Sequence, residues 1–100
     1  MSVIMDRDGS VLTMHMGTTM GGQEAPEWNA QMEREVDENV ETVIMDCSDL
    51  TYISSSGLRI ILKIQKKMDL ADGELILRNV SPEVMEILSS VGFAEFLTIE

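Results

Sequence analysis

The stretch that decides the fold is Thr42-Val-Ile-Met-Asp-Cys-Ser-Asp-Leu-Thr-Tyr-Ile-Ser-Ser-Ser-Gly-Leu58, near the middle of a 100-residue chain. Its first five residues are mostly apolar and rich in branched side chains, as is typical of a central strand covered on both faces. Ser54 or Ser55 can accept a hydrogen bond from a free backbone amide and so cap a helix. The stretch therefore predicts a strand at residues 42–46 and a helix whose first turn contains Ser56.

The residues after this cap have helical spacing. The predicted buried side contains Leu58, Ile60, Ile61, Leu62, Ile64 and Met68. Basic side chains form a band elsewhere on the helix, namely Arg59, Lys63, Lys66 and Lys67. Two interpretations of the band stay open, because it can form a partner surface together with Ser56 or a solvated helix face with cations suited to the C-terminal end.

The segments before residue 42 predict a hairpin and a first helix. Residues 2–6 and 11–17 are apolar-rich and are separated by an Asp-Gly-Ser turn, with His15 on the more polar side of the second strand. Pro26 lies where a helix can begin. Apolar residues recur at every fourth position of that helix, at Trp28, Met32, Val36 and Val40. Its other faces are strongly acidic, which is typical of a solvated surface.

The segments after residue 73 predict a strand at 74–78, a third helix beginning at Ser81-Pro82, and a last strand at 96–99. The buried side of the third helix is expected to contain Val84, Ile87, Leu88 and Val91. Gly92 is expected to have a left-handed conformation. The element order ββαβαβαβ predicts a single α/β domain over residues 1–100, a mixed β-sheet packed by helices with parallel crossovers.

Composition limits the function. The net charge of -11 would repel nucleic acid and an anionic membrane surface, so a protein partner is expected. A single Cys and a single His make neither a disulfide framework nor a four-ligand metal site, and no motif indicates a cofactor. Neither a leader peptide nor an apolar segment long enough for a membrane is visible. We therefore expect a soluble, cytoplasmic protein.

Ser56 is the candidate for modification. A phosphate in the first turn of a helix meets the positive end of the helix dipole and free N–H groups. Gly57 leaves space in which the backbone of another protein, or a nucleotide, could approach closely. The serines can equally serve only as a cap and the glycine only to relieve crowding. Local chemistry does not decide between these interpretations.

The segment from Val43 to Leu58 resembles the core signature of STAS domains, a family named for sulfate transporters and antisigma-factor antagonists. The usual pattern of that family is an apolar strand ending in Asp, a short linker, and Asp-Ser-Ser-Gly-Leu at the start of a helix. The order of elements agrees, and the resemblance covers nearly the whole chain. It extends to Gly17, to residues 25–28 and to the closing Val-Gly-Phe segment.

The resemblance implies a stand-alone antisigma-factor antagonist that is not an enzyme. In such proteins, an antisigma factor with serine kinase activity phosphorylates the serine before the glycine, here Ser56. The unphosphorylated domain binds that factor and releases a sigma factor, and a serine phosphatase would restore binding. The expected partner-binding residues are Ser54, Ser55, Gly57, Leu58, Arg59 and Lys63. Asp46 is expected either to shape the loop that follows it or to be an ordinary turn cap.

Two residues depart from the family pattern. Ser54 replaces the usual aspartate, and Met20 stands near a position that is often acidic. Both changes remove negative charge near Ser56, so they put recognition by the kinase in doubt. The alternative function is a nonphosphorylated STAS adaptor or scaffold subunit, with a weak nucleotide pocket near the strand ends. The glycines at 17, 21 and 22 lack a complete phosphate-binding motif and are better explained as loop hinges.

Other chemistry is less well supported. A hydrolytic triad of Ser56, His15 and Asp46 lacks the G-x-S-x-G turn, and His15 has no evident route to the serine. An aspartyl-phosphate receiver at Asp46 lacks the early acidic pair that would bind a metal ion. Cys47 is expected to be a small buried side chain, because no second cysteine accompanies it. The nine methionines are expected to fill the core.

Overall fold

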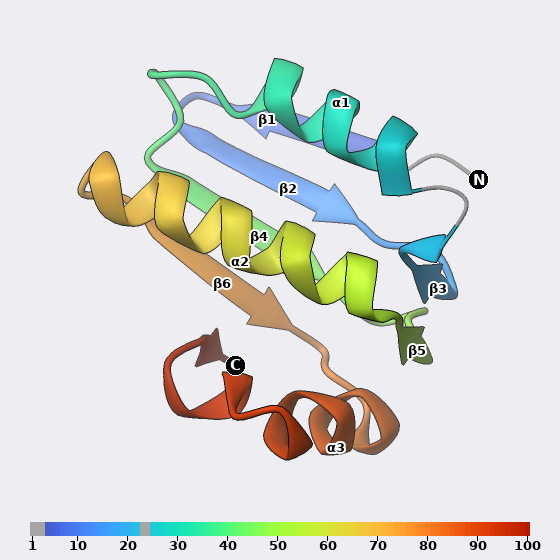
Figure 1. Cartoon of the computed structure of the whole chain (residues 1–100). Helices are drawn as coiled ribbons and strands as arrows, with labels where there is room; N and C mark the ends of the chain where they lie inside the picture. Colours follow the sequence, from blue (N-terminus) through green and yellow to red (C-terminus); the bar gives the residue numbers. More distant parts are fainter. Residues whose placement is uncertain (1–3, 23–24) are drawn as a thin grey trace.

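The structure is a computed structural model that describes residues 4–22 and 25–100 (Figure 1). Its main sheet has the strand order β1-β2-β4-β6-β7. The strands are β1 (Ile4–Asp8), β2 (Val11–His15), β4 (Thr42–Asp46), β6 (Glu74–Arg78) and β7 (Thr98–Ile99). Among these described strands, only the β1–β2 pair is antiparallel. The predicted α/β class, mixed sheet and central position of residues 42–46 are therefore confirmed.

The hairpin forms where the sequence predicts it. Asp8 pairs with Val11, so Gly9 and Ser10 make the turn, and Gly9 has a φ of 63°. The first strand is Ile4–Asp8 rather than residues 2–6. Residues 2 and 3 of that prediction lie outside the described residues.

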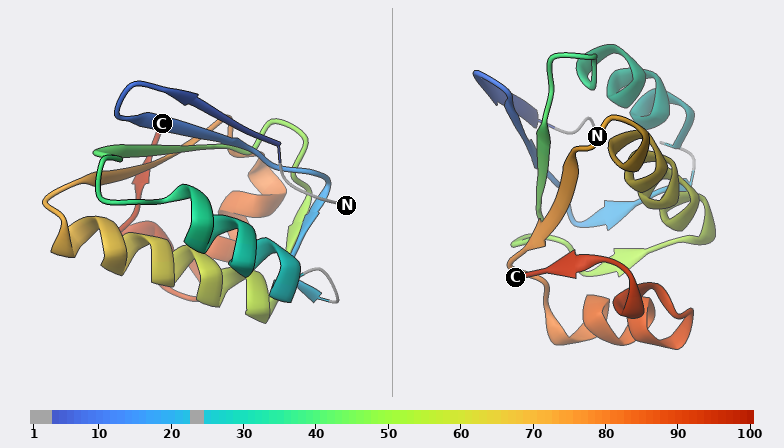
Figure 2. Two further views of the ribbon diagram at one scale, coloured as in Figure 1. Left: turned by 90° about the horizontal axis from the view of Figure 1, so that it is seen from above. Right: turned by 90° about the vertical axis from the view of Figure 1, so that its left-hand side faces the viewer.

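Both long helices lie on the same face of the sheet. Figures 1 and 2 show α1 (Ala25–Glu35) and α2 (Ser55–Leu70) side by side over that face. Inward-facing side chains of β4, such as Val43 and Met45, are fully buried, whereas Ile44 between them is partly exposed. The prediction that β4 is covered on both faces is therefore wrong. Branched residues make the strand apolar, but its burial alternates.

The first helix ends earlier than its apolar repeat. Val36 still bonds to the carbonyl of Met32, but Asp37 then forms a turn in which its carbonyl accepts from the amide of Val40 at 3.1 Å. Asp37 also accepts the amide of Asn39 on its carboxylate at 2.9 Å. Val40 is buried, as expected, but it lies beyond the helix. A local Asp-centred turn thus ends a helix that hydrophobic spacing alone would extend.

The second helix begins at the predicted cap and packs through a slightly rotated stripe. Ser54 is its N-cap, and the buried residues are Gly57, Ile60, Ile61, Ile64 and Met68. Leu58 and Leu62, which the spacing placed on the buried side, are only partly buried. The prediction that the methionines fill the core holds for six of them, whereas Met5 and Met85 are only partly buried. The buried ones are Met14, Met16, Met20, Met32, Met45 and Met68.

The C-terminal part packs at one end of the main sheet. Helix α3 (Pro82–Ser90) is capped by Ser81, whose side chain accepts from the amide of Val84, and Gly92 is left-handed with a φ of 82°. A short 3-10 helix η2 (Phe93–Glu95) precedes β7, so the last strand is shorter than the predicted 96–99. Val91 follows the helix end and is exposed, contrary to prediction.

A second, two-stranded sheet was not predicted. It pairs β3 (Thr19–Met20) with β5 (Tyr52–Ile53) in parallel. Its ladder continues outward, because the amide of Thr51 bonds to the carbonyl of Thr18 and the amide of Ser54 to the carbonyl of Met20. Strands of two residues carry too little periodicity to be recognised in a sequence. This small sheet brings residues 18–22 against the start of α2.

Candidate phosphorylation and partner-binding site

The candidate site is the first turn of α2. Ser54 has extended backbone angles, and its Oγ accepts the amide of Gly57 at 3.3 Å, as expected for an N-cap. Ser55 is exposed and Ser56 is partly buried. The predicted position of Ser56 in the first turn is therefore confirmed.

The turn at Gly21 and Gly22 lies directly against these serines. The amide of Gly22 is 2.8 Å from Ser56 Oγ and 3.1 Å from Ser54 Oγ, and it donates to both. The two serine oxygens are 2.9 Å apart. A segment more than 30 residues away in the sequence thus supplies the donor that holds the Ser56 hydroxyl.

The hydrogen bonds fix the direction of the serine protons. Ser54 Oγ donates its single proton to the carbonyl of Met20 at 3.2 Å. In the bond between the two hydroxyls, Ser56 is therefore the donor and Ser54 the acceptor. Ser54, which replaces the aspartate of the STAS-like pattern, accepts this bond without carrying a charge.

Two glycines permit this close packing. Gly21 has a φ of 107°, and a Cβ there would overlap Ser54 Oγ and lie 2.8 Å from Ser56 Oγ. A Cβ on Gly57 would lie 2.5 Å from the carbonyl oxygen of Met20. Gly57 is buried, so the backbone that approaches it is the chain's own strand β3 rather than that of another protein. Gly21 and Gly22, which the sequence suggested were loop hinges, therefore also pack against the two serines and bond to them.

Asp46 organises the connection that leads from β4 to the site. Its Oδ1 accepts the amide of Ser48 and the side-chain amide of Asn79, each at 3.1 Å. Its Oδ2 lies 3.2 Å from Nδ1 of His15. The hydrogen bond from Asn79, followed by those from Ser48 and His15, lowers the pKa of Asp46 below its usual value, although partial burial opposes this. These bonds fit the loop-shaping interpretation.

The three residues of the hydrolytic triad are only partly brought together. His15 does reach Asp46, and its other ring nitrogen lies 3.0 Å from Asp6. Ser56 is bonded instead to Ser54 and Gly22. The His15–Asp46 contact considered for the triad does form, because the parallel register of β2 and β4 places the two residues opposite each other, but no bond between His15 and Ser56 is present among the described residues.

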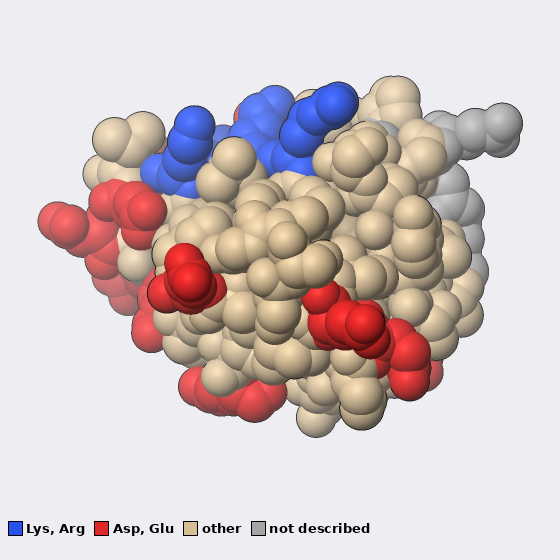
Figure 3. Space-filling view, turned by 60° about the horizontal axis from the view of Figure 1, so that its bottom comes forward, with Lys and Arg blue, Asp and Glu red and all other residues tan. Residues whose placement is uncertain are grey.

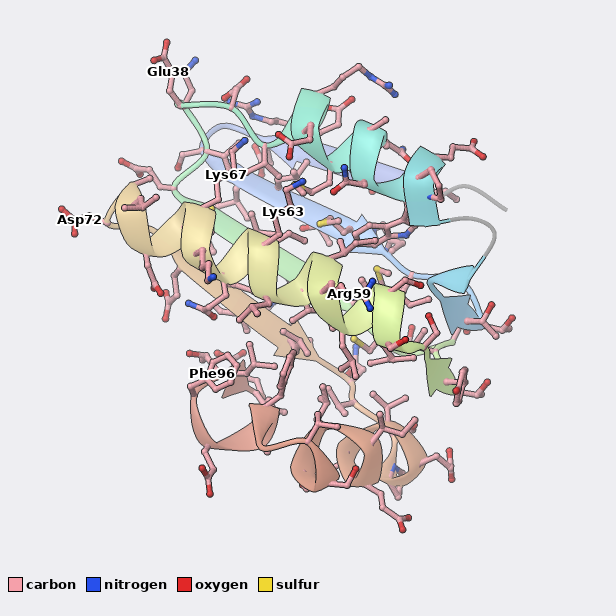
Figure 4. The ribbon with its side chains drawn as sticks, viewed as in Figure 1. Glu38, Arg59, Lys63, Lys67, Asp72 and Phe96 are labelled. Carbon is pink, nitrogen blue, oxygen red and sulfur yellow. The ribbon has the colours of Figure 1, made fainter. Side chains whose placement is uncertain are left out.

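The basic band is divided by its contacts with α1. Lys63 Nζ lies 3.1 Å from Glu33 and 3.2 Å from the side-chain oxygen of Asn29, and Lys67 Nζ lies 3.5 Å from Glu33. The two ammonium groups lower the pKa of the Glu33 carboxyl, with the Lys63 hydrogen bond as the largest cause. Arg59 is exposed and has no side-chain partner among the described residues. Figure 4 shows Arg59, Lys63 and Lys67 along the edge of α2 that faces α1.

Other candidate features lie outside this site. Cys47 is fully buried, and burial, followed by the charge of Asp46, raises the pKa of its thiol to about 12. A shallow hollow lies at the opposite end of α2, lined by Glu41, Thr42, Ala71, Asp72, Gly73 and Glu74. Its three carboxylates make it unsuited to a nucleotide phosphate. Across residues 4–22 and 25–100, no group of three or more His, Cys, Asp or Glu has metal-binding geometry.

Sequence reasoning missed three contributors: the amide of Gly22, the carbonyl of Met20 and the side chain of Asn79. The consecutive glycines were a visible signal of close packing, but nothing in the sequence said which residues they approach. Asn79 has a φ of 58°, a conformation that asparagine tolerates. Within residues 4–22 and 25–100, no helix has both the length and the apolar character needed to span a membrane.

Comparisons with known proteins identify the family and agree with the fold. A family model described as "STAS domain" matches residues 2–100. The chain belongs to the STAS domain family. Its relative "Putative anti-sigma factor antagonist BtrV" from Bordetella bronchiseptica is 29% identical to this STAS domain over 99 residues, which are 99% of this chain and 85% of that protein.

Solved structures share the fold of this STAS domain at low sequence identity. SpoIIAA in its unphosphorylated form has a TM-score of 0.84 and 17% identity, covering 98% of this chain and 87% of that one. The phosphorylated form of the Bacillus protein has a TM-score of 0.77 and 16% identity, covering 98% and 90%. A STAS protein from Planctomyces limnophilus has a TM-score of 0.87 and 14% identity, covering 99% and 88%.

Proposed function

We propose that this STAS domain is an antisigma-factor antagonist that switches partners through phosphorylation of Ser56. The unphosphorylated domain binds an antisigma factor and thereby releases a sigma factor. The antisigma factor acts as a serine kinase on Ser56, and a serine phosphatase restores the binding form. The domain itself works by binding in the cytoplasm, without a catalytic residue or a cofactor of its own.

The observation that carries this proposal is the placement of Ser56. Its hydroxyl lies in the first turn of α2, where the helix dipole favours a negative charge. The first turn of α2 contains no acidic residue. A kinase can reach a side chain that is only partly buried, and Ser56 keeps one oxygen lone pair beyond its bonds to Gly22 and Ser54.

Two comparisons support the proposal. BtrV, of which this chain covers 85%, is named a putative anti-sigma factor antagonist. SpoIIAA, which shares the fold, has been solved in both unphosphorylated and phosphorylated forms. The serine before glycine in the family pattern is Ser56 in this chain.

Phosphorylation would act on the partner surface around α2. We assign that surface to Ser54, Ser55, Gly57, Leu58, Arg59 and Lys63, with Asp46 holding the loop that leads to it. Gly57 supports this surface indirectly, because it lets β3 pack closely against α2. Lys63 can contact a partner only when its ion pair with Glu33 breaks. A phosphate adds about 1.5 to 2 negative charges. A change of about 2 to 3 kcal/mol in binding would weaken the complex roughly thirty to over a hundredfold.

The test is intact and fragment mass spectrometry after incubation with ATP and host extract. Wild type is compared with Ser56→Ala and with Ser55→Ala, which removes the neighbouring exposed hydroxyl. Phosphate on wild type and Ser55→Ala, but not on Ser56→Ala, is the expected result. Binding of the cognate antisigma factor is then measured with and without the phosphate. Unmodified Ser56 beside an active control substrate would overturn the switch.

A second candidate function follows from the uncharged Ser54. With Ser54 in place of aspartate, the Ser56 proton is held by a neutral acceptor, and the hydroxyl is also bonded to Gly22. This arrangement suits a nonphosphorylated STAS adaptor or scaffold subunit. Such an adaptor would bind its partner equally well after ATP treatment, and Ser54→Asp would not change its labelling.

A further inference from the structure

Arg59 belongs to a basic segment within an acidic protein. Residues 50–68 contain Arg59, Lys63, Lys66 and Lys67 but no Asp or Glu, whereas the whole chain has a net charge of -11. Figure 3 shows Lys and Arg side chains gathered along one ridge, with Asp and Glu side chains elsewhere on the same face. The segment that contains Ser56 is therefore basic, whereas the chain as a whole is acidic.

The cations of this segment are not equivalent. Lys63 and Lys67 are paired with Glu33 on α1. Arg59 and Lys66 have no side-chain partner in the described part of the chain. Arg59 follows Ser56 by three residues, a spacing that places helical side chains next to one another, about 5 to 6 Å apart at Cβ. Lys66 lies about three turns from Ser56.

Arg59 also lies on the same side of α2 as Ser56. Ser56 Oγ bonds to Gly22, which immediately precedes the segment leading into α1. Figure 4 shows Arg59 on the edge of α2 that faces α1. Because Ser56 and Arg59 are three residues apart within α2, their side chains lie on neighbouring parts of one helix face.

We propose that a phosphate on Ser56 draws Arg59 into an intramolecular ion pair, and that Arg59 of the unphosphorylated chain binds a carboxylate-bearing surface of the partner. The inference rests on the proposed function, which supplies both the phosphate and the partner. A guanidinium group forms paired hydrogen bonds with phosphate as well as with carboxylate. Phosphorylation then acts twice, because it adds negative charge and withdraws the cation that the partner recognises.

The ion pair is tested without any partner, on protein carrying genetically encoded phosphoserine at position 56. A phosphorus NMR titration follows the second ionisation of the phosphate, which is ordinarily near pH 6. We expect the second pKa of the phosphate to be about half a pH unit lower in wild type than in Arg59→Gln. Arg59→Lys should give a value between these two, and Lys66→Gln should give the wild-type value. Equal titration of wild type and Arg59→Gln would overturn the ion pair.

Recognition is tested with unphosphorylated protein and the cognate antisigma factor. Arg59→Glu is expected to weaken binding about tenfold, and Lys66→Glu by less than about threefold. Equal losses would overturn the role of Arg59 in recognition. Failure to label Ser56 in extract would contradict the proposed function but would not affect the NMR result. A labelled Ser56, together with equal phosphate titration in wild type and Arg59→Gln, would contradict only this inference.

Discussion

At both ends of α2 a glycine packs against a backbone carbonyl, but the polar side chains around the two ends differ. At the N-terminal end a Cβ on Gly57 would lie 2.5 Å from the carbonyl oxygen of Met20, and at the C-terminal end a Cβ on Gly73 would lie 2.6 Å from that of Glu41. The first end gathers three serine hydroxyls and Arg59. The second borders the hollow lined by Glu41, Asp72 and Glu74.

This difference separates packing from function. A glycine against a backbone carbonyl occurs at both ends, so it marks only where chain segments meet. The hydroxyls held by Gly22 and the absence of acid from the first turn distinguish the N-terminal end. The candidate site is therefore identified by its chemistry rather than by its tight packing.

The largest expected effect is the loss of partner affinity when a negative charge is added at the N-terminal end of α2 rather than at the C-terminal end. Ser56→Glu is expected to weaken binding of the antisigma factor about thirtyfold, or about 2 kcal/mol, because it places a carboxylate within the partner surface. Ala71→Glu adds the same charge at the exposed C-terminal end and should change affinity by less than about twofold. Isothermal titration calorimetry measures both. Equal losses would mean that general charge, rather than the site, governs binding.

The next effect tests the packing that the two ends share. Gly57→Ala is expected to lower the free energy of unfolding by about 1.5 kcal/mol, because the new Cβ meets Met20 oxygen and Ile53 Cγ2 at 2.5 and 2.9 Å. Gly73→Ala should lose less, about 1 kcal/mol, because one of its two close contacts is the flexible end of Met68. Urea denaturation compares the variants. A more stable Gly57→Ala would contradict the close approach of β3.

A smaller effect concerns the connection that leads into the N-terminal end. Hydrogen bonds lower the folded-state pKa of Asp46, so its contribution is present above the unfolded-state value of about 3.9 and is lost as pH falls through the folded-state pKa. Asn79→Gly keeps the left-handed backbone and removes the main donor. It should cost about 1 kcal/mol at pH 7.

The same variant should begin to approach wild type as pH falls below the unfolded-state pKa of about 3.9, and the difference should vanish only below the lower folded-state pKa of Asp46. Urea denaturation at pH 7 and at pH 3 measures the difference between the two proteins. A difference that is independent of pH would show that the backbone at position 79, and not the bond to Asp46, is responsible.

The smallest effect concerns the cations between the two ends. Glu33→Gln breaks the exposed pairs with Lys63 and Lys67 and should lower the melting temperature by less than about 2 °C. Because it frees two cations on α2, binding of an acidic partner should become slightly tighter and more dependent on salt. Calorimetry at two salt concentrations measures this change. Unchanged binding would restrict the recognising cation to Arg59.

Much of the fold could be predicted because its causes are local. Strand 42–46, the Ser54 cap and the helix start at Pro82 each depend on residues within a few positions of one another. The exceptions have local causes too, since the turn at Asp37 ends α1 before the apolar repeat does. The two-residue strands β3 and β5 were missed because so short a segment has no period to recognise.

The sequence by itself determined the α/β class and the position of Ser56 in a helical first turn, because hydrophobic spacing and capping act between near neighbours. Its resemblance to the STAS signature at residues 43–58 indicated the family. Only the tertiary structure decided that Gly22 holds Ser56, that His15 meets Asp46, and that both long helices share one face of the sheet. Those contacts depend on strand register and on segments about 30 residues apart, and the geometry that joins such segments is set when the core packs.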